Sequence, residues 1–159
     1  MSTTKMRATR YHDISCGHRV HGHESKCRHL HGHNYRIHFT CQAQPHIIAK
    51  DNIGRVIDFG EIKAKLCMWV ENNWDHKFLA WDQDPVMRAL QHHLRFKDDE
   101  AEVVFEGSLV WVPFNPTAEN MAQYLVHVGG PQMLTDTGVR LVRVDIEETA
   151  KCSGSYEVE

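Results

Sequence analysis

Residues 27–42 read Cys-Arg-His-Leu-His-Gly-His-Asn-Tyr-Arg-Ile-His-Phe-Thr-Cys-Gln, and an alternating pattern runs through their second half. Tyr35, Ile37 and Phe39 share one parity, whereas the positions between them are polar. Successive side chains of a strand point to opposite faces of a sheet, so this alternation predicts a half-buried strand over residues 31–42. Its apolar face should contact a core, and its polar face should not.

The segments around this strand predict the rest of a sheet. Residues 6–18 alternate more loosely, and 139–149 alternate clearly, so both should be strands. Residues 103–112 are rich in β-formers and predict another strand. The charged, poorly patterned stretch 82–102 is interpreted as an insertion or a long loop, partly helical.

Two helices are predicted from their caps and their apolar periodicity. The first should begin after Asp58, with Glu61 at capping-box spacing, and end near Trp74. The second should begin after Thr117 and end at the Gly-Gly-Pro of residues 129–131. The element order then predicts an α+β domain with helices on one face of a mainly antiparallel sheet.

Size and charge narrow the function classes. A chain of 159 residues fits a single domain. The net charge is −3, from 18 Lys and Arg against 21 Asp and Glu. This is not the basic charge of a protein that binds nucleic acid or an anionic membrane surface. No stretch approaches the ~18 apolar residues of a membrane span, and the first 20 residues contain no secretory h-region. Five irregularly spaced cysteines favour a reduced, cytoplasmic protein.

The histidines predict a functional site in residues 18–33, since six of the 13 lie there. His31 and His33 are two apart on the predicted strand, so both rings should point to its core-facing side. His18 has the parity of the apolar residues of the first strand, so the three rings converge if the two strands pair. Three protein ligands leave a fourth position open, which is typical of a catalytic zinc site.

Other interpretations of this cluster stay open from the residues alone. Six histidines in one loop region can form a solvated polar tract or an adventitious metal-binding tract. His21 and His23 are also candidates for ligation, because nothing in their spacing excludes them.

Cys27 is a candidate catalytic thiol. It lies between Lys26 and Arg28 and four residues before His31. Flanking cations and a nearby metal ion both favour the thiolate, which can act as a base or a nucleophile. The alternatives are a cysteine without a special role, or a metal ligand.

Two acidic positions complete the candidates. Asp75 and His76 follow the first predicted helix and suit a proton relay, although a turn that simply ends the helix is the alternative. Glu148 continues the apolar parity of the last strand, so its carboxylate should need a partner. A pterin or guanine edge with two N–H donors would satisfy this carboxylate. The alternatives are a protein arginine as the partner, or a strand end that has already reached solvent.

Five motifs in order resemble one known family. The run from Cys27 to Tyr35 after His18-Arg19 is followed by Val-Ile-Asp-Phe at 56–59, Asp75-His76, Asn-Pro-Thr-Ala-Glu-Asn at 115–120, and Glu148-Thr149. Spread over nearly the whole chain, they resemble the 6-carboxytetrahydropterin synthase family, relatives of 6-pyruvoyltetrahydropterin synthase. The resemblance implies the tunnelling fold, a four-stranded antiparallel sheet with two helices on one face. Such subunits form barrels, usually homohexamers, with active sites at subunit interfaces.

The resemblance also implies roles for the residues. Zn²⁺ would be the cofactor, and a pterin the small-molecule partner. The implied metal ligands are His18, His31 and His33, with His21, His23 and His29 left out; the proton-transfer residues are Cys27, Asp75 and His76; and the pterin-binding residues are Glu148 with Thr117 or Thr149.

Spacing selects the branch of the family. Three residues separate Cys27 from His31, as in the 6-carboxy enzymes, and Cys27 argues against an aldolase branch that uses a glutamate, although Glu24 lies nearby. The implied reaction converts 7,8-dihydroneopterin triphosphate to 6-carboxytetrahydropterin, acetaldehyde and triphosphate, for 7-deazaguanine (queuosine) synthesis. The alternatives are 6-pyruvoyltetrahydropterin synthase and a non-catalytic zinc-binding assembly subunit. Departures from the family are Lys-Phe-Leu-Ala at 77–80 and a longer segment, an expected insertion, at 81–114.

Overall fold

The structure, a computed structural model, describes residues 5–44, 53–95 and 99–159. Its strands are β1 (Arg7–His18), β2 (His31–Ala43), β3 (Phe78–Trp81), β4 (Leu109–Val112), β5 (Val139–Thr149) and β6 (Cys152–Glu157). Its helical segments are η1 (Lys26–Arg28), α1 (Phe59–Ile62), η2 (Lys63–Cys67), α2 (Met68–Asn73), α3 (Pro85–Leu94), α4 (Glu100–Ser108), α5 (Ala118–Tyr124), η3 (Leu125–Gly129) and α6 (Gly130–Met133).

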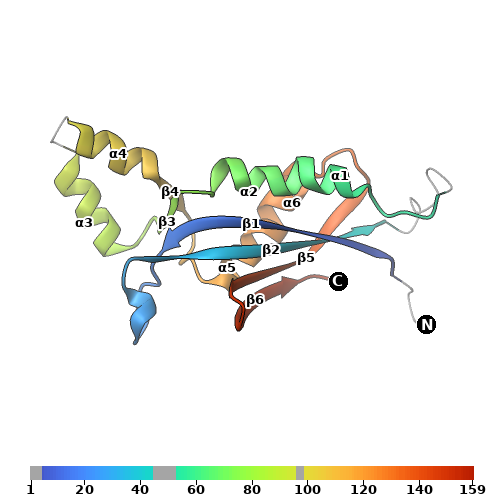
Figure 1. Ribbon diagram of the computed structural model, residues 1–159, viewed down its shortest axis with the longest axis horizontal. Coiled ribbons are helices and arrows are strands. Elements are labelled where there is room, and N and C mark those ends of the chain that lie inside the picture. The colour runs from blue at the N-terminus through green and yellow to red at the C-terminus, as the bar shows by residue number, and fades with distance from the viewer. Residues whose placement is uncertain (1–4, 45–52, 96–98) are drawn as a thin grey trace.

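All six strands form one mixed sheet in the order β4-β3-β1-β2-β5-β6 (Figure 1). The four strands β1, β2, β5 and β6 are antiparallel neighbours, while β3 and β4 extend the sheet beyond β1 in parallel. The predicted α+β class is confirmed, but the prediction of a four-stranded antiparallel sheet is wrong. Sequence patterning missed β3, which has only four residues, and β6, whose Cys-Ser-Gly-Ser start has little β propensity and relies on pairing with β5.

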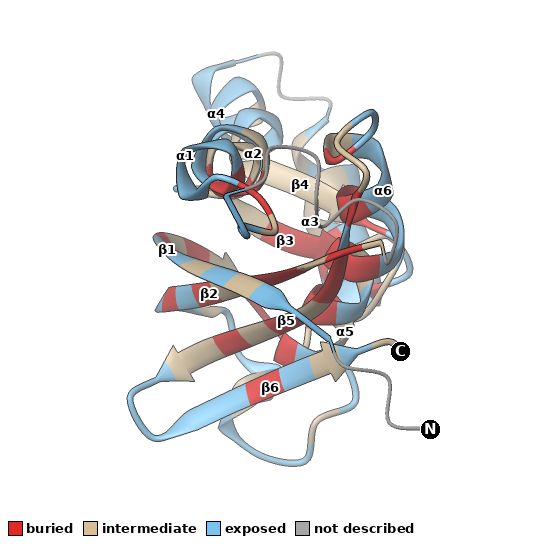
Figure 2. Cartoon of the chain, turned by 90° about the vertical axis from the view of Figure 1, so that its right-hand side faces the viewer, coloured by how far each residue is buried: buried red, intermediate tan, exposed pale blue. Residues whose placement is uncertain are grey.

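The sheet buries one face, as the alternation predicted. Ile14 and Tyr35 are cross-strand partners, as are Phe39 and Val144, and all four are buried. The two long helical segments, 59–73 and 118–133, supply the other side of the core. Figure 2 shows the buried residues gathered between the curled sheet and these helices.

The first long helix is confirmed, and the second is longer than predicted. Asp58 caps the first by accepting from the Gly60 N–H at 2.7 Å. The second continues past the glycines to Met133. A Cβ at Gly130 would lie 2.8 Å from the Cβ of Leu141, so that glycine permits close approach to β5 rather than ending the helix. Pro131 lies where the π-helical segment η3 gives way to α6, near the end of this helical segment.

The predicted strand over 103–112 is half wrong. Residues 100–108 are helix α4, and only Leu109–Val112 are strand. The Asp99 side chain accepts from the backbone N–H groups of Ala101 and Glu102 at 3.0 and 3.4 Å, and this cap with an acidic first turn outweighs a short run of β-formers. Helices α3 and α4 together project from the β3–β4 end of the sheet (Figure 1). Part of the expected insertion, residues 96–98, lies outside the described residues.

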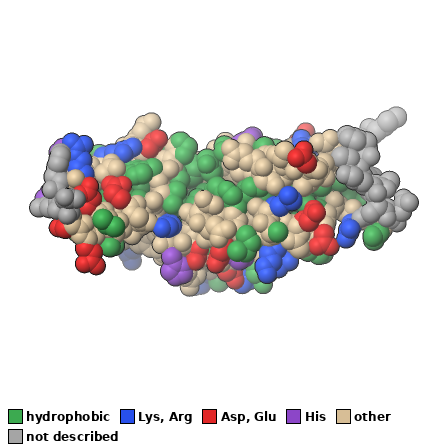
Figure 3. Space-filling model, turned by 90° about the horizontal axis from the view of Figure 1, so that it is seen from above, with side chains coloured by type: hydrophobic (Ala, Val, Ile, Leu, Met, Phe, Trp, Pro, Cys, Tyr) green, Lys and Arg blue, Asp and Glu red, His purple; other side chains and the backbone are tan. Residues whose placement is uncertain are grey.

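On the face that carries α1, α2 and α4, no region is dominated by one sign of charge (Figure 3). Lys, Arg, Asp and Glu side chains are interspersed there (Figure 3). Within the described ranges, no helix is both long and apolar enough to cross a bilayer. The cytoplasmic location stays a prediction.

Candidate functional site

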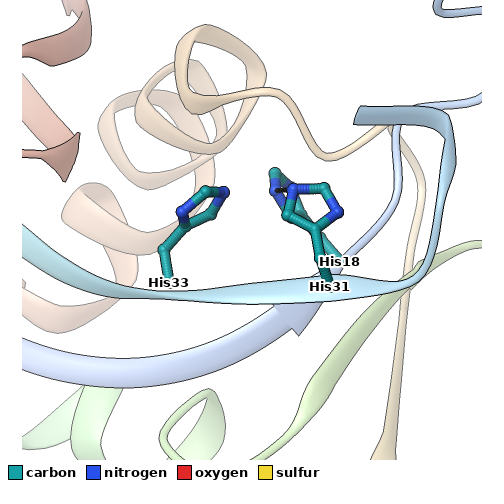
Figure 4. Close-up of side chains that lie close together, drawn as sticks. All are labelled: His18, His31 and His33. Carbon is teal, nitrogen blue, oxygen red and sulfur yellow. Dashed lines mark hydrogen bonds between the residues drawn. The ribbon is translucent and has the colours of Figure 1, made fainter. Parts of the chain in front are cut away.

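Strand pairing brings the three predicted metal ligands together. His18 is the cross-strand partner of His31, and His33 is the partner of Cys16, so all three rings project from the core-facing side at one end of β1 and β2. One nitrogen from each ring lies within 4.8 Å of the others. Figure 4 shows the rings turned toward a common point above the strands. Convergence, which the sequence predicted only on condition of this pairing, is therefore confirmed.

Backbone carbonyls determine which ring nitrogens face one another. The Nδ1 of His18 donates to the Pro116 carbonyl at 2.6 Å, and the Nδ1 of His31 donates to the His29 carbonyl at 2.7 Å. Since a carbonyl can only accept, both Nε2 atoms are left with a lone pair when the rings are neutral. These two Nε2 atoms lie 3.1 Å apart. Held in this way, they suit a shared cation.

Burial favours the neutral, metal-binding form of His18 and His33. Loss of solvent lowers the pKa of His18 to about 4, against the opposing effect of the Pro116 carbonyl, and burial also lowers the pKa of His33. The Nε2 atom of His33 is buried and has no hydrogen-bond partner among the described residues. An orphaned acceptor is costly, and a metal ion would satisfy it. Three neutral imidazoles are a donor set that Zn²⁺ accepts, so these residues fit the implied cofactor.

A cavity of about 320 Å³ adjoins the cluster. It unites three sequence-predicted residues from distant parts of the chain, namely Cys27, Thr117 and Glu148, with the metal-cluster residue His18. A pocket of this size suits a small ring system.

The cavity position of Cys27 is fixed by hydrogen bonds to the end of β1. Its 3₁₀ turn, η1, is held because the Cys27 carbonyl accepts from the Val20 N–H at 2.8 Å. The next carbonyl, that of Arg28, accepts from Nε of Arg19 at 2.8 Å. The thiol itself is half-buried. The turn is therefore tied to the two residues that directly follow the metal-cluster residue His18.

Glu148 lies where β5 leaves regular pairing with β6. Its two carboxylate oxygens are 3.8 Å from Nε2 of His18 and 3.9 Å from Nε2 of His33. No lysine or arginine forms an ion pair with it in the described part of the chain, so the alternative of a protein arginine partner is not supported. The carboxylate remains available to a ligand in the cavity.

The 115–120 motif holds His18 and His21 in place by hydrogen bonds. The Asn115 side chain accepts from the His21 N–H at 3.0 Å and donates to the His21 carbonyl at 2.8 Å. Pro116 fixes the His18 ring, and the Thr117 hydroxyl accepts from the Asn120 N–H at 3.2 Å as the cap of α5. Thr117 is therefore both a helix cap and a cavity residue.

Besides His31 and His33 of the cluster, three other predicted site residues do not line this cavity within the chain. Asp75 and Thr149 line a separate groove, and His76 lines a shallow hollow that also includes His33. Asp75 accepts from the Ser15 N–H at 2.8 Å, and His76, with φ of 56°, contacts the Asp75 carboxylate at 2.6 Å through Nδ1. These hydrogen bonds hold the pKa of Asp75 below its usual value despite the opposing effect of burial. The pair therefore lies in the turn that ends the first long helix.

Some cavity residues were not predicted as site residues. Glu119 and Cys152 also line the cavity, with Ser153, Gly154 and His23, which the sequence had left open only as a possible metal ligand. Glu119 belongs to a quoted motif, which could have signalled it. Cys152 carried no signal, because only the β5–β6 hairpin brings it beside Glu148.

Comparisons with known proteins identify the family. The profile described as 6-pyruvoyl tetrahydropterin synthase matches residues 7–159. A Rickettsia typhi protein named 6-carboxy-5,6,7,8-tetrahydropterin synthase is 30% identical over 148 residues, covering 92% of this chain and 96% of that protein.

Solved structures share the fold. An uncharacterised Wolinella succinogenes protein superposes with a TM-score of 0.81 at 22% identity, covering 99% of this chain and all of that one. The 6-pyruvoyl tetrahydropterin synthase of Caenorhabditis elegans gives 0.60 at 21% identity, covering 100% and 99%. With the profile covering nearly the whole sequence and with a cavity beside three convergent histidines, this chain belongs to the 6-pyruvoyl tetrahydropterin synthase family.

Proposed function

We propose that this protein is a zinc-dependent 6-carboxy-5,6,7,8-tetrahydropterin synthase, a carbon–carbon lyase of 7-deazaguanine synthesis. The observation that carries the proposal is the cavity, which combines a histidine of the metal cluster, the thiol of Cys27 and the carboxylate of Glu148. The name of the Rickettsia typhi relative, similar over most of both chains, points to the same activity.

The overall reaction follows from the three-carbon side chain of the substrate. 7,8-Dihydroneopterin triphosphate and water give 6-carboxytetrahydropterin, acetaldehyde and triphosphate. The first side-chain carbon is oxidised to the carboxylate while the pterin ring is reduced, and the other two carbons leave as acetaldehyde. No external oxidant or reductant is needed, because the side chain supplies the electrons that the ring takes up.

Three histidines would hold the metal through Nε2. When bound, Zn²⁺ supplies Lewis-acid polarisation of the side-chain hydroxyls of the substrate. His18 and His31 keep their lone pairs directed inward because carbonyls hold their Nδ1 protons. His21 and His29 are not part of the cluster, and His23 lines the cavity without joining it.

Glu148 and Cys27 would act on different parts of the substrate. The carboxylate of Glu148 accepts two hydrogen bonds from the ring N–H and amino group, which orients the side chain toward the histidines. The Cys27 thiolate takes a proton from a side-chain carbon. Thr117 adds a hydroxyl at the cavity wall, whereas Thr149, in the other groove, contributes only if that groove belongs to a neighbouring site.

The Asp75–His76 pair would complete a site with a neighbouring subunit. It is the predicted second proton-transfer group, yet His76 is 83% exposed and does not line this cavity. Among the described residues, strands β4 and β6 also leave unpaired edges at the two ends of the sheet. Closing the sheets of several chains into a barrel, most simply a homohexamer, would cover edges and bring Asp75 and His76 to a partner's cavity.

The test is product analysis. Purified, zinc-loaded protein is incubated with 7,8-dihydroneopterin triphosphate, and pterins, aldehydes and triphosphate are quantified. We expect 6-carboxytetrahydropterin and acetaldehyde in equal amounts. A 6-pyruvoyl pterin without acetaldehyde would identify the other branch of the family, and zinc binding without turnover would indicate an assembly subunit.

A further inference from the structure

A buried ion pair contacts η1, the turn that carries Cys27. Arg19 follows His18 at the end of β1, and its guanidinium forms an ion pair with Asp84 through Nη1. The two side chains are only 9% and 1% exposed. The other arm of the same guanidinium, Nε, donates to the Arg28 carbonyl of η1 at 2.8 Å. One side chain therefore connects the Cys27 turn to a segment more than 50 residues away.

Asp84 is itself firmly placed. It caps α3 by accepting from the Val86 N–H at 2.9 Å, and its own N–H donates to the Trp81 carbonyl at 3.0 Å. It thus belongs both to the end of β3 and to the start of the projecting α3–α4 hairpin. No role followed from the sequence for this hairpin, which lies within the expected insertion.

The chemistry of the pair favours positioning over stability. A buried ion pair costs much of its Coulomb energy in desolvation, so it is a weak source of stability. The planar guanidinium, in contrast, directs its donors in fixed directions, which a lysine cannot do. With Nη1 fixed by Asp84, Nε has one direction in which to donate, and the Arg28 carbonyl lies there.

We infer that Arg19 and Asp84 are positioning residues for Cys27, and that the α3–α4 segment anchors the catalytic turn through them. The inference rests on the proposed function only in calling Cys27 catalytic. Val20 ties the Cys27 carbonyl and Arg19 ties the Arg28 carbonyl, so loss of Asp84 leaves η1 held on one side. The thiol would then move relative to the cavity, while the His18 ring keeps its support from the Pro116 carbonyl.

The experiment measures the Cys27 thiol directly. The full-length protein is alkylated with iodoacetamide, and each cysteine is quantified by peptide mass spectrometry. Cys152 is the internal reference, because it lines the same cavity but lies on β6, away from Arg19. The buried thiols Cys16, Cys41 and Cys67 report any global unfolding.

Asp84→Asn is compared with Asp99→Asn. Both aspartates are helix caps of the same hairpin, and asparagine keeps a capping oxygen in each. Only at Asp84 does the change also remove the charge that neutralises a buried guanidinium, that of Arg19, and an amide oxygen accepts a weaker hydrogen bond from it than a carboxylate does. We expect the ratio of Cys27 to Cys152 alkylation to rise about fivefold in Asp84→Asn and not in Asp99→Asn, as the turn opens locally. In the zinc-loaded enzyme, kcat should fall about tenfold with KM nearly unchanged, because a small misplacement of a catalytic group is costly.

A second variant covers the case in which an unpaired Arg19 unfolds the protein. Arg19→Gln combined with Asp84→Asn removes both charges, and one amide cannot replace the two directed donors of the guanidinium. If the buried thiols react in Asp84→Asn, the double variant is used, and the same rise in the Cys27 ratio is expected. An unchanged ratio in a folded variant would overturn the inference. A raised ratio in a protein whose wild type shows no turnover would support the inference and reject the proposed function.

Discussion

Two histidine-containing regions of this molecule differ in burial and in completeness. The cluster of His18, His31 and His33 lies at the core-facing side of the sheet, with His18 only 1% exposed and the Nδ1 atoms of His18 and His31 held by backbone carbonyls. The Asp75–His76 pair lies in a turn, with His76 83% exposed. A buried, preorganised set can work with the residues of one chain. An exposed pair needs something outside the chain to exclude water from it.

Removal of the histidine cluster should have the largest effect. His31→Ala with His33→Ala leaves a single imidazole, so we expect bound zinc to fall from one per chain to none and turnover to become undetectable. Metal content after dialysis is measured by atomic emission. Asp75→Asn with His76→Gln is the matched control and should retain one zinc per chain. Zinc loss in the control would show that the two regions form one metal site.

Removing the thiol separates chemistry from metal binding. Cys27→Ala should lower kcat by ~10²–10⁴, the usual effect of losing a general base, with zinc content and folding nearly unchanged. Cys152→Ala tests whether any cavity thiol has this effect, and we expect a much smaller loss there. If Cys27→Ala loses zinc, the thiol is a ligand and the three-histidine site is incomplete.

Glu148→Gln probes ring recognition without the metal or the triphosphate. Glutamine keeps the size but places a donor against a donor of the ring, so binding of a simple pterin should weaken by ~2–4 kcal/mol, roughly 30- to 1,000-fold in Kd. The neighbouring Glu147→Gln is the control, since Glu147 contacts His38 at 2.6 Å and does not line the cavity. Equal affinities of the wild type and Glu148→Gln would place the ring anchor elsewhere.

Burial of the cluster predicts a pH dependence of stability in the metal-free protein. The pKa of His18 is about 4 when folded and near 6.5 when unfolded, so the unfolded chain binds more protons between these values. Stability should therefore fall by about 3 kcal/mol as the pH drops from 7 to 4, through this group alone. Urea unfolding is followed in the presence of a chelator, with His18→Gln as the comparison. The same pH dependence in His18→Gln would assign the effect to other groups.

Mixed oligomers test whether the exposed pair serves a neighbour. Cys27→Ala and His76→Ala subunits, each nearly inactive alone, are unfolded together and refolded. If each site takes Cys27 from one chain and His76 from another, random assembly should restore about a quarter of the sites. Refolding each variant separately before mixing is the control. No recovery in the co-refolded sample would contradict the shared site.

Local sequence patterns were sufficient for the parts of the fold that local rules control. The alternation in residues 31–42 predicted β2 and its buried face, and Asp58 and Thr117 were correctly predicted as caps. The errors came where longer-range packing competes with local propensity. Gly130 looked like a stop signal because its contact with β5 is invisible in the sequence, and β6 was missed because its pairing with β5 supplies what its composition lacks.

The sequence by itself determined the donor types of the site and, through strand parity, the common face of His18, His31 and His33. Parity is a local property, since it depends only on the two-residue repeat of a strand. The tertiary structure added that β1 pairs with β2 so that these rings meet, that the Pro116 carbonyl selects Nε2 of His18, and that Glu148 reaches the cluster. These features depend on contacts between residues distant in the chain, and no local pattern specifies such contacts.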